Sequence, residues 1–146
     1  MKLPLIIALD FDMTIADSHP FPAIKGFRKG AEKYIRKLHK EGYYIIIWTC
    51  RTDKEETCND AQMAREFLEQ NDVPFHLFNE NHPALINCFK NNCRKIACDL
   101  YVDDKGLWPF GIPSWRTLYW MIKWKSWFLK PKQYILSHCK PEHFEY

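Results

Sequence analysis

The sequence predicts an α/β protein whose mainly parallel, Rossmann-like sheet is covered by helices as a three-layer α/β/α sandwich. Four apolar runs are continuous rather than alternating, which is typical of strands buried on both faces. Segments with helical spacing separate these runs, and this alternation indicates right-handed βαβ units. At 146 residues the chain has room for one domain and none for a cap domain. We expect a single domain over 1–146, with a core over 3–105 and an aromatic helix and tail over 106–146.

The apolar runs give the expected strands in order along the chain. They are LPLIIALDF (3–11), YYIIIWT (43–49), PFHLF (74–78) and KIACDLYVDD (95–104). Between the first two, apolar residues from Phe27 to Leu38 recur at helical spacing, and Gly42 stands where such a helix would end. Further helices are expected over roughly 56–71 and 82–92, where the apolar faces are shorter.

The composition changes after Lys105, because five of the six tryptophans follow it. Apolar residues over 114–128 have helical spacing and predict a terminal helix that packs on the sheet. Lysines flank the aromatic residues, so a contact with another subunit or with a membrane surface is the alternative. A homo-oligomer formed through this aromatic C-terminal region is therefore a candidate assembly.

The composition also argues against several classes of protein. With 47% hydrophobic and 27% charged residues, the chain can bury a core and is not expected to be disordered. Its net charge of +3 is small for a nucleic-acid binder. No run of about 18 uncharged apolar residues predicts a membrane span, and no export signal is evident. We interpret the six cysteines as reduced thiols in a cytoplasmic protein.

Aspartates, a threonine, a cysteine and an arginine follow three of the four expected strands. They are Asp10 and Asp12 after the first, Thr49, Cys50 and Arg51 after the second, and Asp103 and Asp104 after the fourth. Because the carboxyl ends of parallel strands meet at one edge of a sheet, we expect these groups to lie together. Unpaired carboxylates there need a cation, and Mg²⁺ prefers oxygen ligands of this type. Together with hydroxyl and guanidinium groups suited to an oxyanion, they point to phosphoryl transfer.

These residues, in this order, resemble the four motifs of the haloacid dehalogenase superfamily. The segment from Asp10 to Thr14 reads DxDxT, Thr49 ends the second strand, a lysine precedes the fourth, and Asp103 and Asp104 end it. The resemblance covers roughly 3–105, and motifs in this order are far more specific than DxD alone. It implies a small, capless, phosphatase-like member, because helices and strands fill the stretches where a cap would be inserted.

The resemblance implies a role for each carboxylate. Asp10 would be the nucleophile that becomes an aspartyl phosphate, and Asp12 would protonate the leaving oxygen and later activate water. Asp10, the main-chain carbonyl of Asp12, and Asp103 would ligate Mg²⁺, with Asp104 supporting them or binding through water. Dehalogenating members lack an acid at the position of Asp12, so phosphate ester hydrolysis is favoured here. Met13 stands where many members have glycine.

Other residues would bind the phosphate or the substrate. Thr49 would hydrogen-bond the phosphoryl oxygens, with Cys50 and Arg51 beside it at the strand end. Lys95 is expected to offset the charge between the nucleophile and the phosphate, and Lys90 is the alternative to it. Further candidates for substrate contact, all of which follow strand ends, are Arg51, Asn79, Glu80 and Asn81.

The activity that the resemblance implies is Mg²⁺-dependent hydrolysis of a phosphomonoester, either a small molecule or a macromolecule, through an aspartyl-phosphate intermediate. Two alternatives stay open. One is a nucleotidase or phosphotransferase that uses the same chemistry. The other is a non-catalytic binding protein that retains the site.

Overall fold

The structure is a computed structural model that describes residues 3–54 and 58–129. Its central sheet has four parallel strands in the order β7-β4-β1-β8. These strands are β1 (Ile6–Leu9), β4 (Tyr44–Ile47), β7 (Leu77–Phe78) and β8 (Leu100–Val102). The predicted α/β class and the parallel sheet are confirmed, and each strand lies within one of the four apolar runs.

Four helices accompany the sheet in the described part of the chain. They are α1 (Ala31–Lys40), α2 (Asp60–Gln70), α3 (Pro83–Phe89) and α4 (Trp115–Leu129). The first helix begins at Ala31 rather than near Phe27, because Phe27 belongs to a strand and Gly30 has a left-handed φ of 82° before the helix. The third ends at Phe89, because Lys90 is itself left-handed with a φ of 51°.

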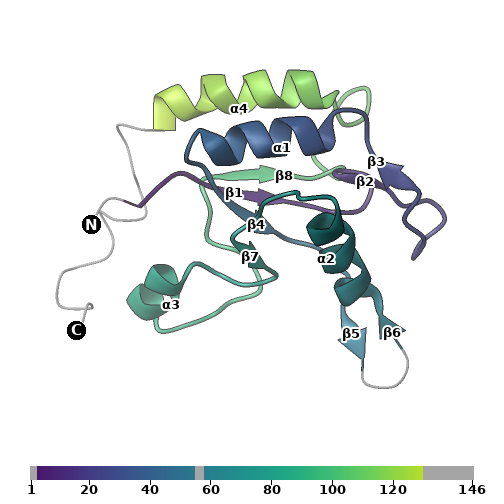
Figure 1. Ribbon diagram of the computed structural model, residues 1–146. Coiled ribbons are helices and arrows are strands. Elements are labelled where there is room, and N and C mark those ends of the chain that lie inside the picture. The colour runs from purple at the N-terminus through teal and green to yellow at the C-terminus, as the bar shows by residue number, and fades with distance from the viewer. Residues whose placement is uncertain (1–2, 55–57, 130–146) are drawn as a thin grey trace.

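The helices lie on different faces of the sheet because of the order of its strands. The chain moves from β1 to β4 to β7 in one direction and then returns to β8 beyond β1. Right-handed crossovers therefore put α1 and α2 on one face and α3 on the other. The core has this arrangement, since Ile7 and Ile45 pack in the cluster of α1, α2 and α4, whereas Ile6 packs with Leu85 of α3. Figure 1 shows α1 and α4 side by side, across the sheet from α3.

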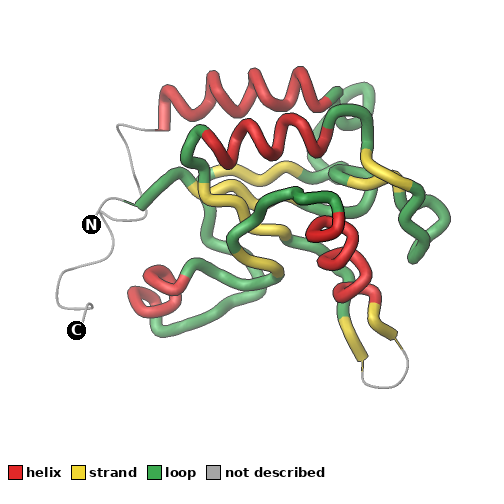
Figure 2. The backbone as a smooth tube through the Cα atoms, viewed as in Figure 1, coloured by secondary structure: helices red, strands yellow, loops and turns green. Residues whose placement is uncertain are grey.

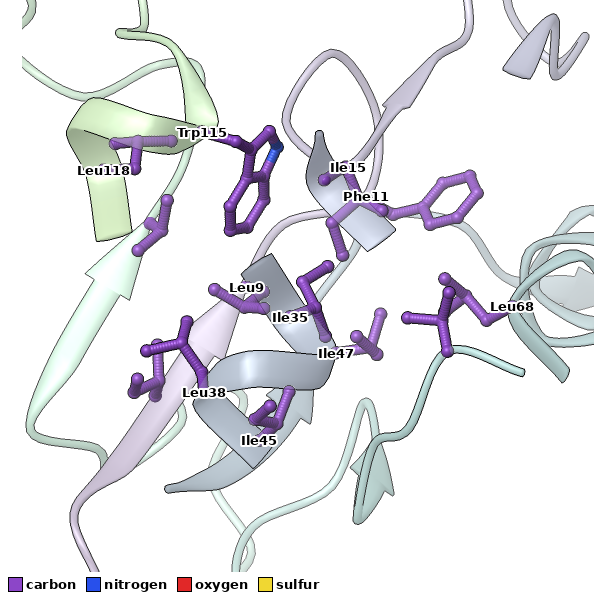
Figure 3. Packing of buried hydrophobic residues seen from close by; sticks show 14 of the residues in the cluster. Leu9, Phe11, Ile15, Ile35, Leu38, Ile45, Ile47, Leu68, Trp115 and Leu118 are labelled. Carbon is purple, nitrogen blue, oxygen red and sulfur yellow. The ribbon is translucent and has the colours of Figure 1, made fainter. Parts of the chain in front are cut away.

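The larger core cluster joins the sheet to α1 and α4. Leu9 and Ile47 of the sheet, Ile35 of α1 and Trp115 of α4 are all fully buried. Figure 3 shows Trp115 directed into this cluster beside the aliphatic side chains. The expected packing of the terminal helix on the core is thereby confirmed for the described residues of α4.

Two small hairpins were not predicted. One pairs β2 (Ala16–Asp17) with β3 (Gly26–Phe27), and the other pairs β5 (Asp53–Lys54) with β6 (Cys58–Asn59). Strands of two residues are too short to show alternation of apolar and polar side chains. Figure 2 shows both hairpins as short yellow segments outside the central sheet. They lie at the end of the molecule toward which β1 runs (Figure 1).

The helices and cysteines bear on two further expectations. Within residues 3–54 and 58–129, no helix is both long and apolar enough to cross a membrane.

Cys50, Cys58, Cys93 and Cys98 are free thiols. Cys88 is disulfide-bonded, so the expectation of reduced thiols is wrong for this residue.

Candidate active site

Three carboxylates meet at the carboxyl edge of the sheet. One oxygen from each of Asp10, Asp103 and Asp104 lies within 4.8 Å of the others. Strand pairing produces this meeting, because β1 and β8 are parallel neighbours and the N–H of Asp10 donates to the carbonyl of Val102 at 2.9 Å. The residues that follow the two strands therefore lie together, although they are far apart in the sequence. All three residues are partly buried.

Thr14 connects two of these three residues, Asp10 and Asp104. Its buried hydroxyl donates to Oδ2 of Asp10 at 3.1 Å and accepts from the N–H of Asp104 at 2.9 Å. Its carbonyl accepts from the indole of Trp115 at 2.8 Å and from the guanidinium of Arg28 at 3.3 Å. The last residue of the DxDxT segment thus links the segments that follow β1 and β8 to α4.

Burial beside the other carboxylates raises the pKa of the Asp10 carboxyl from its ordinary 3.8 to about 7. Burial is the main cause, and the charge of Asp103 adds to it, while the hydrogen bond from Thr14 opposes it. A divalent cation would remove the repulsion that the carboxylates exert on one another. Three carboxylates within reach of one ion are also the oxygen donors that Mg²⁺ prefers, so the residues fit this metal.

Asp12 lies outside this group of three carboxylates. Its oxygens accept from Nη2 of Arg51 at 2.7 Å and from Nε at 3.0 Å. The hydroxyl of Thr49 donates to Asp12 at 3.4 Å. The structure therefore brings together Asp12, Thr49 and Arg51 as predicted, but it directs the Asp12 side chain to the arginine and not to the other carboxylates.

Arg51 is itself 1% exposed and enclosed by several groups. The rings of Phe11 and Phe21 lie 5.1 and 5.0 Å from its guanidinium carbon, and the carbonyl of Pro22 accepts from Nη2 at 3.0 Å. Within the described residues, Nη1 is buried and has no hydrogen-bond partner. Cys50, between Thr49 and Arg51, is exposed.

The strand-end asparagines have structural hydrogen bonds. Asn79 accepts from the N–H of Thr49 at 2.8 Å and donates to the carbonyl of Arg51 at 3.2 Å, and it thereby fixes the end of β4. Asn81 is buried and accepts from the N–H of Ala97 at 2.7 Å. Glu80, between them, is exposed. The amides of both asparagines are thus used within the protein.

The lysine that accompanies the carboxylates is Lys105. Its ammonium lies 2.9 Å from Oδ2 of Asp104. The hydrogen bond to Asp104 is the main reason why the pKa of Lys105 is raised. Lys95 is exposed in the loop before β8, and Lys90 is exposed at the end of α3. Within the described part of the chain, no hydrogen bond or ion pair joins either lysine to a carboxylate of the site. The adjacency of Lys105 to Asp104 is the sequence signal that could have identified it.

The backbone at Met13 has the conformation that glycine adopts most readily. Met13 has a left-handed φ of 58° and is 40% exposed. This conformation costs roughly 1–2 kcal/mol for a residue with a Cβ and nothing comparable for glycine. The turn between Asp12 and Thr14 therefore has the geometry that favours glycine, and the methionine adopts it under strain.

Comparison with known proteins adds one relative. No protein-family model and no curated protein matches the sequence. A solved structure of a conserved protein from Bacteroides thetaiotaomicron is 30% identical, with a TM-score of 0.69, over 84% of this chain and 92% of that chain. Identity at this level over nearly the whole of the other protein indicates common descent as well as a common fold. The chain belongs to the same family as this conserved Bacteroides protein.

Proposed function

We propose that the protein is a Mg²⁺-dependent phosphatase of the haloacid dehalogenase superfamily that hydrolyses a phosphomonoester. The observation that carries the proposal is the meeting of Asp10, Asp103 and Asp104 beside the pair of Asp12 and Arg51. One part of the site is suited to a divalent cation, and the other is suited to proton transfer and to binding an oxyanion. Both are needed to transfer a phosphoryl group to a carboxylate.

Asp10 and Asp103 would hold Mg²⁺ directly, and Asp104 would support it. Bound there, the metal would reduce the repulsion between the carboxylates and a phosphate dianion. Lys105 would offset further charge, in the role that we predicted for Lys95, because its ammonium already faces Asp104.

The reaction would proceed in two steps. An oxygen of Asp10 attacks phosphorus, the bond from phosphorus to the leaving oxygen breaks, and Asp12 gives that oxygen a proton. Asp12 then takes a proton from water as the water attacks the aspartyl phosphate, which releases phosphate and restores Asp10. Arg51 holds Asp12 in position for both steps.

The proposal includes two features of the fold, the three-layer α/β/α arrangement and the absence of a cap domain. It also includes a cytoplasmic location. A nucleotidase or phosphotransferase would use the same residues. A binding protein that retains the site is the alternative from a different class, and turnover distinguishes it.

A generic aryl phosphate tests the proposal. We expect the protein to release phosphate from it in the presence of Mg²⁺ and to lose this activity, by at least about 100-fold, when a chelator removes the metal. Steady-state phosphate release measures both. If no substrate in a panel of aryl phosphates, sugar phosphates and nucleotides is hydrolysed with Mg²⁺ present, the protein is a binding protein and the phosphatase proposal is wrong.

We also propose that α4 mediates self-association through its aromatic face. Trp120, Trp124, Trp127 and Phe128 are 60, 65, 77 and 57% exposed. They recur at helical spacing on the side opposite the buried Leu118 and Ile122. Exposed apolar patches on one side of a helix are typical of contact surfaces.

Charge introduced into the aromatic face tests this assembly. We expect the wild-type protein to sediment as a dimer or larger species and the Trp124→Glu/Trp127→Glu variant as a monomer, since each carboxylate would have to be buried at the contact. Sedimentation velocity is the measurement. Lys125→Glu, an exposed change on the same helix, is the control and should not alter the species. A monomeric wild type would refute self-association through α4.

A further inference from the structure

We propose that a basic pocket beside the loop over residues 10–14, called here the catalytic loop, binds a second phosphate group of the substrate. The inference rests on the proposed function, and it narrows the substrate to an organic bisphosphate of about nucleotide size. The pocket has a volume of about 900 Å³. It is lined by residues of the catalytic loop, of β2 and β3, of the turn between β3 and α1, of α1 and of the start of α4, among them Met13, Arg28, Lys29, Lys33, Tyr34 and Arg116.

The pocket carries a strong excess of positive charge. Arg28, Lys29, Lys33 and Arg116 line it, and the only acidic residue among the described residues that line it is Asp17. The sequence as a whole has 21 basic and 18 acidic residues, so this balance is a local feature. Concave surfaces of one sign concentrate ions of the opposite sign. The pocket is therefore suited to an anion.

Three of the four cations are available to a ligand. The guanidinium of Arg28 already donates to main-chain carbonyls of Thr14, Ile112 and Pro113. Lys29, Lys33 and Arg116 are exposed, and none forms an ion pair within the described part of the chain. A phosphate group has oxygens enough to accept hydrogen bonds from all three cations, and such charge-assisted bonds are the strong ones.

The pocket and the carboxylates share one segment of chain. Met13 lines the pocket and lies between Asp12 and Thr14 in the catalytic loop. Arg28 and Trp115, which also line the pocket, both donate to the carbonyl of Thr14. A substrate whose scissile phosphate lies at the carboxylates can therefore extend past Met13 into the pocket.

The size and lining of the pocket indicate what joins the two phosphates. A volume of about 900 Å³ is at the upper end of the range for drug-sized ligands, so there is room for a sugar and a base. The rings of Phe27 and Tyr34 line the pocket and offer apolar surface to such a body. The pocket thus combines contacts for an organic group with contacts for a distant anion.

The test compares binding of adenosine 3′,5′-bisphosphate and adenosine 5′-monophosphate by calorimetry without Mg²⁺, so that no turnover intervenes. We expect the wild type to bind the bisphosphate at least tenfold more tightly, and the Lys33→Ala/Arg116→Ala variant to lose most of this preference. Lys40→Ala, an exposed change at the other end of α1, is the matched control and should retain it. Equal binding of the two ligands by the wild type, or an unchanged preference in the double variant, would overturn the proposal.

Hydrolysis of the aryl phosphate separates this inference from the proposed function. The double variant should hydrolyse it at the wild-type rate, because a substrate with one phosphate does not use the pocket. A protein that prefers the bisphosphate but hydrolyses no phosphate would keep the pocket and refute the phosphatase. A protein that hydrolyses the aryl phosphate without preferring the bisphosphate would support the phosphatase and refute the pocket.

Discussion

The Asp10→Asn variant should lose phosphate release by at least about 10³-fold and, at the same time, be more stable than the wild type without metal at pH 8. The loss of activity follows because an amide is not a nucleophile toward phosphorus. The gain in stability follows because the variant no longer holds an ionised carboxylate beside Asp103 and Asp104. Removing a catalytic group commonly relieves such strain.

The gain in stability should depend on pH in a defined direction. The folded protein retains a proton on Asp10 up to a pKa of about 7, whereas the unfolded chain releases it near 3.8. The wild-type free energy of unfolding therefore falls as the pH rises between these values, by on the order of 4 kcal/mol in all. The variant has no such carboxyl, so its advantage should be absent at pH 4, grow up to pH 7 and stay constant above it.

Urea unfolding in a chelator at pH 4, 6 and 8 measures this dependence, and phosphate release with Mg²⁺ measures the activity. Asp72→Asn is the matched control, since Asp72 is exposed and has a left-handed φ of 52° that asparagine also tolerates. It should change neither quantity. A variant at Asp10 that keeps its turnover would exclude the aspartyl-phosphate route.

Arg51→Met should destabilise the protein by about 3 kcal/mol. Removing one partner of a buried ion pair costs about 3–5 kcal/mol, and the 26% exposure of the Asp12 side chain favours the lower end. The change also leaves Phe11 and Phe21 without the guanidinium that both rings contact. Activity should fall together with stability, because Asp12 would lose the group that positions it.

A double variant separates the ion pair from the packing around it. Asp12→Asn/Arg51→Met removes both charges, so it should be more stable than Arg51→Met alone. Arg51→Lys keeps the charge but loses the planar donors that contact both oxygens of Asp12, so it should recover only part of the stability. Urea unfolding at pH 7 compares the three. If Arg51→Met costs less than about 1 kcal/mol, the ion pair does not stabilise the fold.

The strands could be predicted from the sequence, but their limits could not. A continuous apolar run shows that both faces are buried, and this sufficed for Ile6–Leu9 and Tyr44–Ile47. The run over 95–104 forms a strand only from Leu100, because the carboxylate of Asp99 accepts the N–H of Ile6 and ends the pairing there. A side chain that competes for a backbone group of another strand leaves no periodic signal.

The site was predictable where strand ends determine it. Asp10 and Asp103 meet because their strands are neighbours, and the alternation of strands and helices implies a shared edge. The lysine was not predictable in this way. The chain before β8 crosses the other face of the sheet, where Ile96 packs near Leu85, and this carries Lys95 away from the edge that Lys105 occupies.

The bond from the indole of Trp115 to the carbonyl of Thr14 has a consequence for biosynthesis. The two residues are 101 positions apart, so the loop that carries Asp10 and Asp12 is synthesised well before the residue that anchors it. A growing chain on the ribosome exposes Asp10 and Asp12 long before α4 has emerged to fix the loop between them and Thr14. The loop is therefore anchored only after α4 has been synthesised and has docked on the core.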